Sequence, residues 1–372
     1  MNGTSGEMSG TEIMRLSYVF ACIRNISEDV AKMGIRVIRR EGKNRNIDYV
    51  HPLNNFFGSG GQPNHVYTTF DLIQGWVFNS LIYGSGYIRV IRDAYFEPIE
   101  LYIMEPRHVT KIADGYEIYN SRTNQKTVVP FYDVLELKCL TINGITGKGV
   151  NDWAATSFAN ADSLQQFSLN WFQNGGNISG ILQTDSALTQ DQFNRLTEQI
   201  QGWSGGDNSG SIPVLEAGVK FQTVSPTLDK AQLVEAKKSA GLEVCSWFRM
   251  PPHKVQIMEG STFSNIEHQG IEYVTDTIQS WVTKIEQEIN RKLVKENEKQ
   301  TIGIKFNLNT LLRGDSASRA AYLTAMVAGG IMEINEARSV EDLNPVEGGD
   351  ELRVPLQNAP IEVANQHFSK VE

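Results

Sequence analysis

The stretch "TFSNIEHQGIEYVTDTIQSWVTKIEQEINRKL", residues 262–293, predicts one long amphipathic helix. Its apolar residues recur at steps of three, four or eight positions, which places them on one face of a helix. These residues are Phe263, Ile266, Val274, Ile278, Trp281, Ile285, Ile289 and Leu293. At ~1.5 Å per residue, a helix of this length extends roughly 45 Å. We therefore expect a strut that packs on one face only.

The size and charge of the chain limit what it can be. A length of 372 residues exceeds what one hydrophobic core usually supports and favours about two to three structural units. Acidic residues outnumber basic ones, 43 to 34, which gives a net charge of −9. Because general nucleic-acid binders cover phosphates with Lys and Arg, this charge argues against that class. Any contact with DNA is expected to be weak or local.

Cysteine usage and apolar runs indicate the compartment. Cys22, Cys139 and Cys245 are far apart in sequence and form no CxxC pair. This pattern argues against a disulfide framework and a structural zinc site, and favours a reducing compartment. The first residues lack the basic and apolar regions of a secretory signal, and the longest apolar runs span about nine residues where a bilayer needs about 20. We expect a soluble protein made in the cytosol.

Hydrophobic periodicity predicts a chain of the α+β class. Helical stripes at residues 14–33 and 67–83 are followed by short alternating segments between residues 84 and 139, which predict an antiparallel β layer. Beyond the opening stretch, the pattern predicts a strand from Ile302, two helices from Asp315 onward and a polar tail.

Two further long helices are expected in the middle of the chain. One starts at a capping Asp152, and the other ends before Pro251 and Pro252, because proline breaks a helix. Between them, residues 178–225 predict a compact αβ insertion that contains a helix capped by Thr189.

Short motifs imitate catalytic or nucleotide-binding sites without the required context. The GWSGG motif around Ser204 matches a nucleophile elbow, which needs a strand before the serine, but the pattern there predicts a helix. GITGKG, from Gly144, lacks the spacing of a phosphate-binding loop. The six histidines never occur at metal-ligand spacing. Glu286 and Glu288, two positions apart, lie on different faces of a helix. The sequence therefore predicts no catalytic residue, metal site or cofactor.

Several stretches together resemble one protein family. They are "YVFACIRNISEDVAKM", "HPLNNFF", "LIYGSGYIRVIRD", "FNLNTLLRGD", "NEARSVEDLNPVEGGDEL" and, most specifically, "MPPHKV" followed by the opening stretch. These stretches are similar to the HK97-type portal proteins of tailed bacteriophages, and they occur in the family's order. The resemblance runs from Leu16 to Leu352, which is nearly the whole chain.

The resemblance implies a portal fold with wing, stem, clip and crown parts, assembled as a ring with a central channel. The ring, commonly of twelve subunits, would lie at one vertex of the capsid, and double-stranded DNA would pass through it during packaging and ejection. Expected partners are further copies of the chain, the terminase large subunit, head-completion or adaptor proteins, and the major capsid and scaffolding proteins. The resemblance implies no enzymatic activity, no cofactor and no membrane, with synthesis in the bacterial host cytoplasm and a final location in the virion.

The family's parts can be placed on this chain segment by segment. They are the wing 1–151, a stem helix 152–177, the clip 178–226, a second stem helix 227–250, the tunnel loop 251–262, a long wing helix 263–300, the wing return strand and crown helices 301–352, and a polar tail 353–372. In the family, the tunnel loop points at the DNA, and the clip is the docking place of the motor and later of head-completion proteins.

This placement implies two groups of functional residues. Those expected at the DNA channel, in the tunnel loop and stem, are Lys237, Lys238, Lys254, Gln256, Met258 and Glu259. The lysines would touch phosphate transiently, although they can also be interpreted as ordinary solvent-facing lysines. Those expected at the docking surface of the clip helix are Gln192, Arg195, Glu198 and Gln199.

Two other interpretations stay open from the sequence. One is a monomeric or dimeric serine hydrolase that uses Ser204, which requires a strand leading into that serine. The other is a capsid scaffold or interaction protein without DNA passage, which differs from a portal in lacking a central channel.

Overall fold

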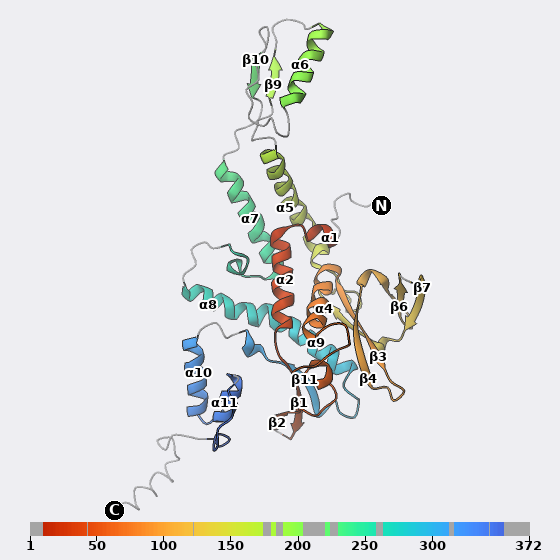
Figure 1. Cartoon of the computed structure of the whole chain (residues 1–372), viewed down its shortest axis with the longest axis vertical. Helices are drawn as coiled ribbons and strands as arrows, with labels where there is room; N and C mark the ends of the chain where they lie inside the picture. The colour runs from red at the N-terminus through yellow and green to blue at the C-terminus, as the bar shows by residue number, and fades with distance from the viewer. Residues whose placement is uncertain are drawn as a thin grey trace, which may run out of the picture. The chain divides into compact units, whose positions relative to one another are not determined.

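The computed structural model describes residues 10–42, 44–121, 123–173, 180–183, 189–203, 220–223, 230–257, 263–311, 316–341 and 343–352. The chain divides into two compact units, Met1–Leu308 and Asn309–Glu372, and each is described by itself. Helices and strands are mixed along the larger unit (Figure 1), as the α+β prediction requires.

Three small antiparallel sheets form the β layer of the larger unit. Their strand orders are β11-β1-β2 (Ile302–Phe306, Ile35–Glu41, Asn44–Ile47), β4-β3-β8 (Pro98–Met104, Ser85–Arg92, Val134–Lys138) and β5-β6-β7 (Val109–Ile112, Gly115–Asn120, Gln125–Val129). The sequence pattern misses β7, because the first four of its five side chains are exposed and give no alternation.

Two helices are stacked on the sheet that contains β3. Helix α2 (Ser17–Ala31) packs against α4 (Thr69–Tyr83), and α4 packs against β3. A capping box starts α4, in which the backbone N–H of Thr68 donates to Asp71 Oδ2 at 3.0 Å and the N–H of Asp71 donates to Thr68 Oγ1 at 3.2 Å. The helix expected at residues 14–33 is α2, and a short helix that was not expected, α1 (Gly10–Ile13), precedes it and ends in a turn.

Helix α9 (Gln279–Lys292) packs against two edge strands, β11 and β8, which belong to different sheets. Figure 1 shows α9 beside β11. Its apolar face is buried, as the stripe predicts, with Trp281, Val282, Ile285 and Ile289 at 7% exposure or less. Since β11 and β8 each end a sheet, their outer backbone groups have no neighbouring strand to bond.

Polar side chains of α9 take the place of the missing strands. The backbone N–H of Ile304 donates to Asn290 Oδ1 at 2.8 Å, and the N–H of Phe306 donates to Glu286 Oε1 at 2.9 Å. On the other side, the N–H of Glu136 donates to Glu288 Oε1 at 3.0 Å. Glu286 and Glu288 therefore lie on different faces of the helix, as predicted, and each serves a different sheet.

The segment before α9 is helical throughout, with one irregular turn. Helix α8 (Phe263–Glu272) passes into a π-helical turn, η5 (Tyr273–Ile278), which leads into α9. The hydroxyl of Thr275 donates to the carbonyl oxygens of Ile271 and Glu272, each at 3.1 Å, where α8 passes into this turn. The helix ends at Lys292, within one residue of the predicted end at 293. The rest of the segment 263–300 assigned to the long wing helix consists of hydrogen-bonded turns that lead into β11.

Helices α5 (Val150–Gln173) and α7 (Lys230–Phe248) pack along each other (Figure 1). The rings of Phe158 and Phe248 stack between them with centroids 6.3 Å apart. The expected N-cap, Asp152, lies inside the first turn of α5. Its carboxylate accepts the backbone N–H of Gly149 at 2.7 Å, which is the reverse half of a capping box.

The smaller unit contains the helices α10 (Ser316–Ala328) and α11 (Ile334–Val340). Asn335 fixes the loop that follows α11, because its Oδ1 accepts the N–H of Val346 at 2.7 Å and its Nδ2 donates to Asp350 Oδ1 at 2.9 Å. Gly349 packs directly on this side chain, where a Cβ would come within 2.4 Å of Asn335 Oδ1. The expected helix cap Asp315 and the tail 353–372 lie outside the described residues.

The edge contacts of α9 predict a large effect for Glu288→Ala. The change leaves the buried N–H of Glu136 without an acceptor and removes the partner of Lys292 Nζ, which lies 2.8 Å from Glu288 Oε1 with both side chains under 10% exposed. We expect the free energy of unfolding to fall by about 3–5 kcal/mol, measured by urea denaturation. Gln279→Ala, on the exposed face of α9, is the control and should change it by less than about 0.5 kcal/mol. A loss below about 1 kcal/mol for Glu288→Ala would contradict this role.

Candidate functional site

The turn after α7 is more ordered than the irregular loop expected there. Pro252–Val255 form a 3-10 turn, η4, and Arg249 and Gln256, which flank the turn, have positive φ angles of 49° and 66°. The backbone N–H of Ile257 donates to the carbonyl of Pro252 at 3.0 Å. Thr277 of the π turn donates its hydroxyl to the carbonyl of Arg249 at 2.8 Å. The end of α7 is thus joined directly to the segment that leads into α9.

Lys254 holds this turn against α2. Its Nζ lies 2.9 Å from Asp29 Oδ2 and 4.3 Å from the ring centroid of Tyr273. The Nδ2 of Asn25 donates to the carbonyl of Lys254 at 3.1 Å. Lys254 was expected near the DNA channel, and the structure gives its ammonium group an acidic partner within its own chain.

Asp29 is a buried carboxylate with two lysine partners. Its side chain is 8% exposed and pairs with Lys32 as well as Lys254. Burial tends to raise the pKa of Asp29, but the hydrogen bonds and charges of the two lysines outweigh burial and lower the pKa below its ordinary value of 3.8. Asp29 is therefore ionised at neutral pH and connects α2 to the turn.

The other residues expected at the channel lie in separate surroundings. Lys237 and Lys238 are half-buried on α7, and Lys237 Nζ donates to Ser168 Oγ of α5 at 2.6 Å. Gln256 is exposed at the end of the turn. Met258 and Glu259 lie outside the described residues. The structure brings Lys237 and Lys254 to different elements, so these residues do not form one described cluster.

The clip segment contains a helix that begins after Thr189, but the hydroxyl of this expected cap donates to a side chain instead of accepting a backbone N–H. Strand β9 (Gly180–Gln183) pairs antiparallel with β10 (Lys220–Thr223), and helix α6 is Gln190–Trp203. The backbone N–H and the hydroxyl of Thr189 both donate to Gln192 Oε1 at 3.0 Å. The exposed docking candidate Gln192 thus also caps α6.

The remaining docking candidates are only partly described. The side chain of Arg195 is exposed, whereas those of Glu198 and Gln199 lie outside the described residues. Phe193, between Gln192 and Arg195, is 55% exposed and was not singled out from the sequence. An exposed aromatic on a polar helix is the signal that would have drawn attention to it.

The structure disfavours the serine hydrolase interpretation. Ser204 itself lies outside the described residues, but α6 continues to Trp203 immediately before it, and a nucleophile elbow requires a strand there. Within the described ranges, no group of three or more His, Cys, Asp or Glu side chains could hold a metal ion. Across the same described ranges, none of the helices combines the length and apolarity needed to cross a bilayer.

The contacts of α2 with α7 and the turn after it were missed from the sequence. Cys22 of α2 and Cys245 of α7 are both free and buried, and the neighbouring Cys245 together with burial raises the pKa of Cys22. Asn25 and Asp29 hold Lys254, as described above. The sequence does contain a signal for Asp29. An acidic residue in the last turn of a helix interacts unfavourably with the helix dipole, so its presence there indicates a tertiary partner.

Asp29 predicts a pH-dependent contribution to stability. A carboxyl whose pKa is lower in the folded than in the unfolded state stabilises the fold above its unfolded pKa and loses this effect as the pH falls through its folded pKa. Asp29→Asn is therefore expected to lower the free energy of unfolding by about 1–3 kcal/mol at pH 7. The difference from the unsubstituted protein should shrink as the pH falls below 3.8, as measured by denaturation at a series of pH values.

The control is Glu28→Gln, one position away on the same helix. Glu28 pairs with Arg24 at 2.8 Å, but the two side chains are 36% and 59% exposed. Solvent screening limits such a pair to about 0–1 kcal/mol. Equal losses for the two substitutions, or a loss for Asp29→Asn that stays constant between pH 7 and acid, would contradict the role assigned to Asp29.

Known proteins resemble this chain in both sequence and fold. It is 27% identical to the portal protein of Enterobacteria phage HK97, over 94% of this chain and 84% of that protein. It is 25% identical to the probable portal protein of Streptomyces phage phiC31, over 95% of this chain and 80% of that protein.

A solved structure of an HK97 family phage portal protein from Corynebacterium diphtheriae has the same fold, with a TM-score of 0.64 and 17% identity over 84% of this chain and 99% of that one. A chain in the neck of an empty gene transfer agent (GTA) particle gives a TM-score of 0.61 and 18% identity, over 92% and 95% of the two chains. The family model described as phage portal protein matches residues 17–342. This chain therefore belongs to the phage portal protein family, whose members are structural proteins.

Proposed function

We propose that this portal protein assembles into a closed ring and that double-stranded DNA passes through the ring's channel into and out of a capsid. Family membership supports the portal role. The neck of a native GTA particle, solved with C12 symmetry, contains a chain of the same fold, with a TM-score of 0.59. A ring of about twelve identical subunits with head-to-tail contacts is the corresponding assembly here.

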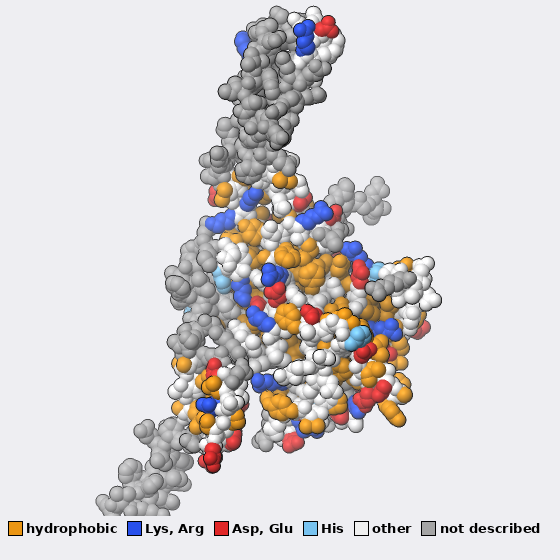
Figure 2. Space-filling model, viewed as in Figure 1, with side chains coloured by type: hydrophobic (Ala, Val, Ile, Leu, Met, Phe, Trp, Pro, Cys, Tyr) orange, Lys and Arg blue, Asp and Glu red, His pale blue; other side chains and the backbone are white. Residues whose placement is uncertain are grey.

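The observation that best supports a ring is that several apolar side chains on the helices of the larger unit are exposed. Trp247 on α7 and Trp153 on α5 are 42% and 44% exposed, and Phe20 on α2 is exposed to a similar extent. Figure 2 shows hydrophobic side chains gathered over α2 and α4 on one face of this unit. Exposed apolar patches of this kind favour a protein partner.

The distribution of these side chains fits a head-to-tail contact. Leu242 and Trp247, both on α7, are five residues apart and so lie about 140° apart around the helix. Both are about 40% exposed. A head-to-tail ring needs two different contact surfaces on every subunit, and α7 offers apolar side chains on both of its flanks.

Weak contact with DNA suits a channel through which DNA must slide. Each phosphate neutralised by a lysine or arginine adds to affinity, and the net charge of −9 keeps this effect small. We keep Lys237 and Lys238 as transient phosphate contacts, with Gln256, Met258 and Glu259 at the tip of the tunnel loop. We assign Lys254 primarily to holding that loop, because of its pairing with Asp29.

The other parts keep the roles that the family resemblance implies. The clip, with Gln192, Arg195, Glu198 and Gln199, is proposed to dock the terminase large subunit and later the head-completion or adaptor proteins. Phe193 is added to this surface because of its exposure. The wing and crown are proposed to face the major capsid and scaffolding proteins. The protein would be made in the bacterial host cytoplasm and end in the virion, at the portal vertex.

The native mass of the purified protein, with negative-stain images of the same sample, tests the ring. We expect a species of about 500 kDa, built from subunits of 41.6 kDa, with a central hole wide enough for duplex DNA. A large assembly without a hole would instead favour the scaffold interpretation. A subunit that stays monomeric even with capsid and scaffolding proteins present would contradict the proposal.

A packaging assay tests the tunnel loop separately. Met258→Asp places a negative charge where the loop is proposed to meet DNA, so the amount of packaged DNA should fall while the mass and shape of the ring stay unchanged. Ala94→Asp, in the exposed turn between β3 and β4, adds the same charge away from both the tunnel loop and the clip and is the control. Unchanged packaging by Met258→Asp would contradict the proposal that Met258 lies at the tip of the tunnel loop.

A further inference from the structure

The smaller unit leaves its apolar side chains uncovered. In the described parts of residues 320–352, no apolar side chain is buried. Tyr322 on α10, Ile331 between the helices and Leu343 after α11 are 50%, 68% and 51% exposed. Two short helices without buried apolar contacts have little to stabilise them, since helical stability in proteins comes mostly from packing of an apolar face. This unit therefore needs a partner.

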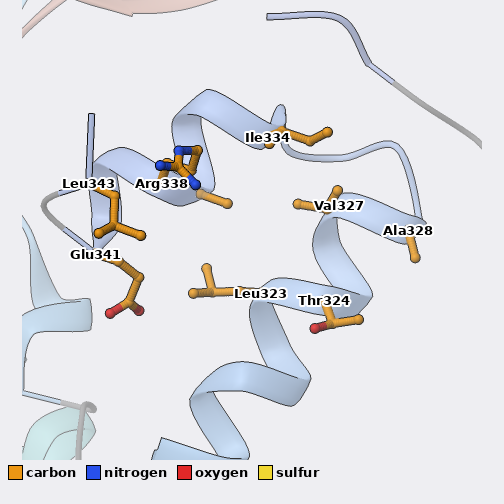
Figure 3. A pocket seen from close by; sticks show the side chains of 9 residues that line it. Leu323, Thr324, Val327, Ala328, Ile334, Arg338, Glu341 and Leu343 are labelled. Carbon is orange, nitrogen blue, oxygen red and sulfur yellow. The ribbon is translucent and has the colours of Figure 1, made fainter. Parts of the chain in front are cut away.

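Helices α10 and α11 enclose an open hollow of about 430 Å³. Its lining is mostly apolar and includes Leu323, Val327, Ile334, Ala337 and Leu343. Leu323 and Val327 of α10 and Leu343 point into the space between the helices (Figure 3). Leu323 and Val327 are four residues apart, so they form a ridge along one face of α10. The hollow has the form of a groove that can receive the apolar face of another helix.

The charge around this groove indicates which kind of helix fits. Residues 316–352 contain seven acidic and two basic residues, for a net charge of −5. Glu341 lies on the groove itself. Arg338, the basic residue on the groove, is engaged within its own chain, since its Nε donates to the carbonyl of Asn344 at 2.8 Å. A second copy of this unit would bring like charges together, whereas a basic helix would be attracted.

We propose that the α10–α11 groove binds an amphipathic helix from another protein, with aliphatic residues on its apolar face and Lys or Arg on its polar face. The aliphatic side chains cover Leu323, Val327 and Leu343, and the basic side chains meet Glu341 and the acidic surroundings. This inference goes beyond the proposed passage of DNA and does not depend on it.

Binding of two matched synthetic peptides to the full-length protein tests the proposal. Both peptides have about 18 residues with Leu at positions i, i+3, i+4 and i+7, and they differ in having Lys or Glu at the polar positions. Fluorescence anisotropy of labelled peptides measures both dissociation constants. The Lys peptide should bind at least about tenfold more tightly than the Glu peptide, and added salt should reduce the difference.

Substitutions on α10 and α11 distinguish the groove from general charge attraction. Leu323→Asp should weaken the Lys peptide about tenfold, because it places a charge on the apolar ridge. Ala325→Asp, exposed on the same helix and outside the groove, adds the same charge and should change binding by less than about twofold. Glu341→Lys should weaken the Lys peptide and strengthen the Glu peptide. Unchanged circular dichroism and native mass show that the variants keep their fold.

Four results would overturn the proposal. Equal binding of both peptides, or equal losses for Leu323→Asp and Ala325→Asp, would mean that the groove does not recognise a basic helix. A smaller native mass caused by Leu323→Asp alone would assign the groove to a second copy of this chain. Failure of both peptides to bind would mean that another part of the protein already fills the groove.

Discussion

The hydrogen bonds between the side chains of α9 and the backbone of two edge strands hold the larger unit together. A strand at the edge of a sheet presents N–H and C=O groups that must be bonded when they are buried. Asn290 and Glu286 accept from β11, and Glu288 accepts from β8. With the apolar side chains of the same helix buried between these contacts, α9 joins two sheets that share no strand.

Hydrogen bonds also connect the segment before α9 to α7, and the turn after α7 to α2. The π turn before α9 bonds the carbonyl of Arg249 at the end of α7. Lys254 in the following turn is held by Asp29 and Asn25 of α2. The turn after α7 is thus bonded both to α2 and to the segment that leads into α9. Glu288 and Asp29 make these connections as buried carboxylates paired with lysines. Removing one member of such a buried pair is costly, because the other charge is left without a partner.

The two units of the chain differ in how far they bury their apolar side chains. The larger unit buries a core along α2, α4 and α9 and leaves scattered aromatics on α5 and α7 exposed. The smaller unit buries almost nothing among its described residues and is strongly acidic. The ring that we propose would cover the exposed side chains of the larger unit, and the basic helix that we propose would cover those of the smaller unit.

The sequence by itself determined the α+β class, the helical strut, the proline-ended helix before it and the family, because periodicity, proline and segment order are local properties. Only the tertiary structure decided what Lys254, Glu286 and Glu288 do, since their partners Asp29, Phe306 and Glu136 are far away in the chain. The π turn was also beyond the pattern, because an apolar stripe does not distinguish α from π turns. Which side chains stay exposed, and thus where partners bind, depends on packing that no local pattern contains.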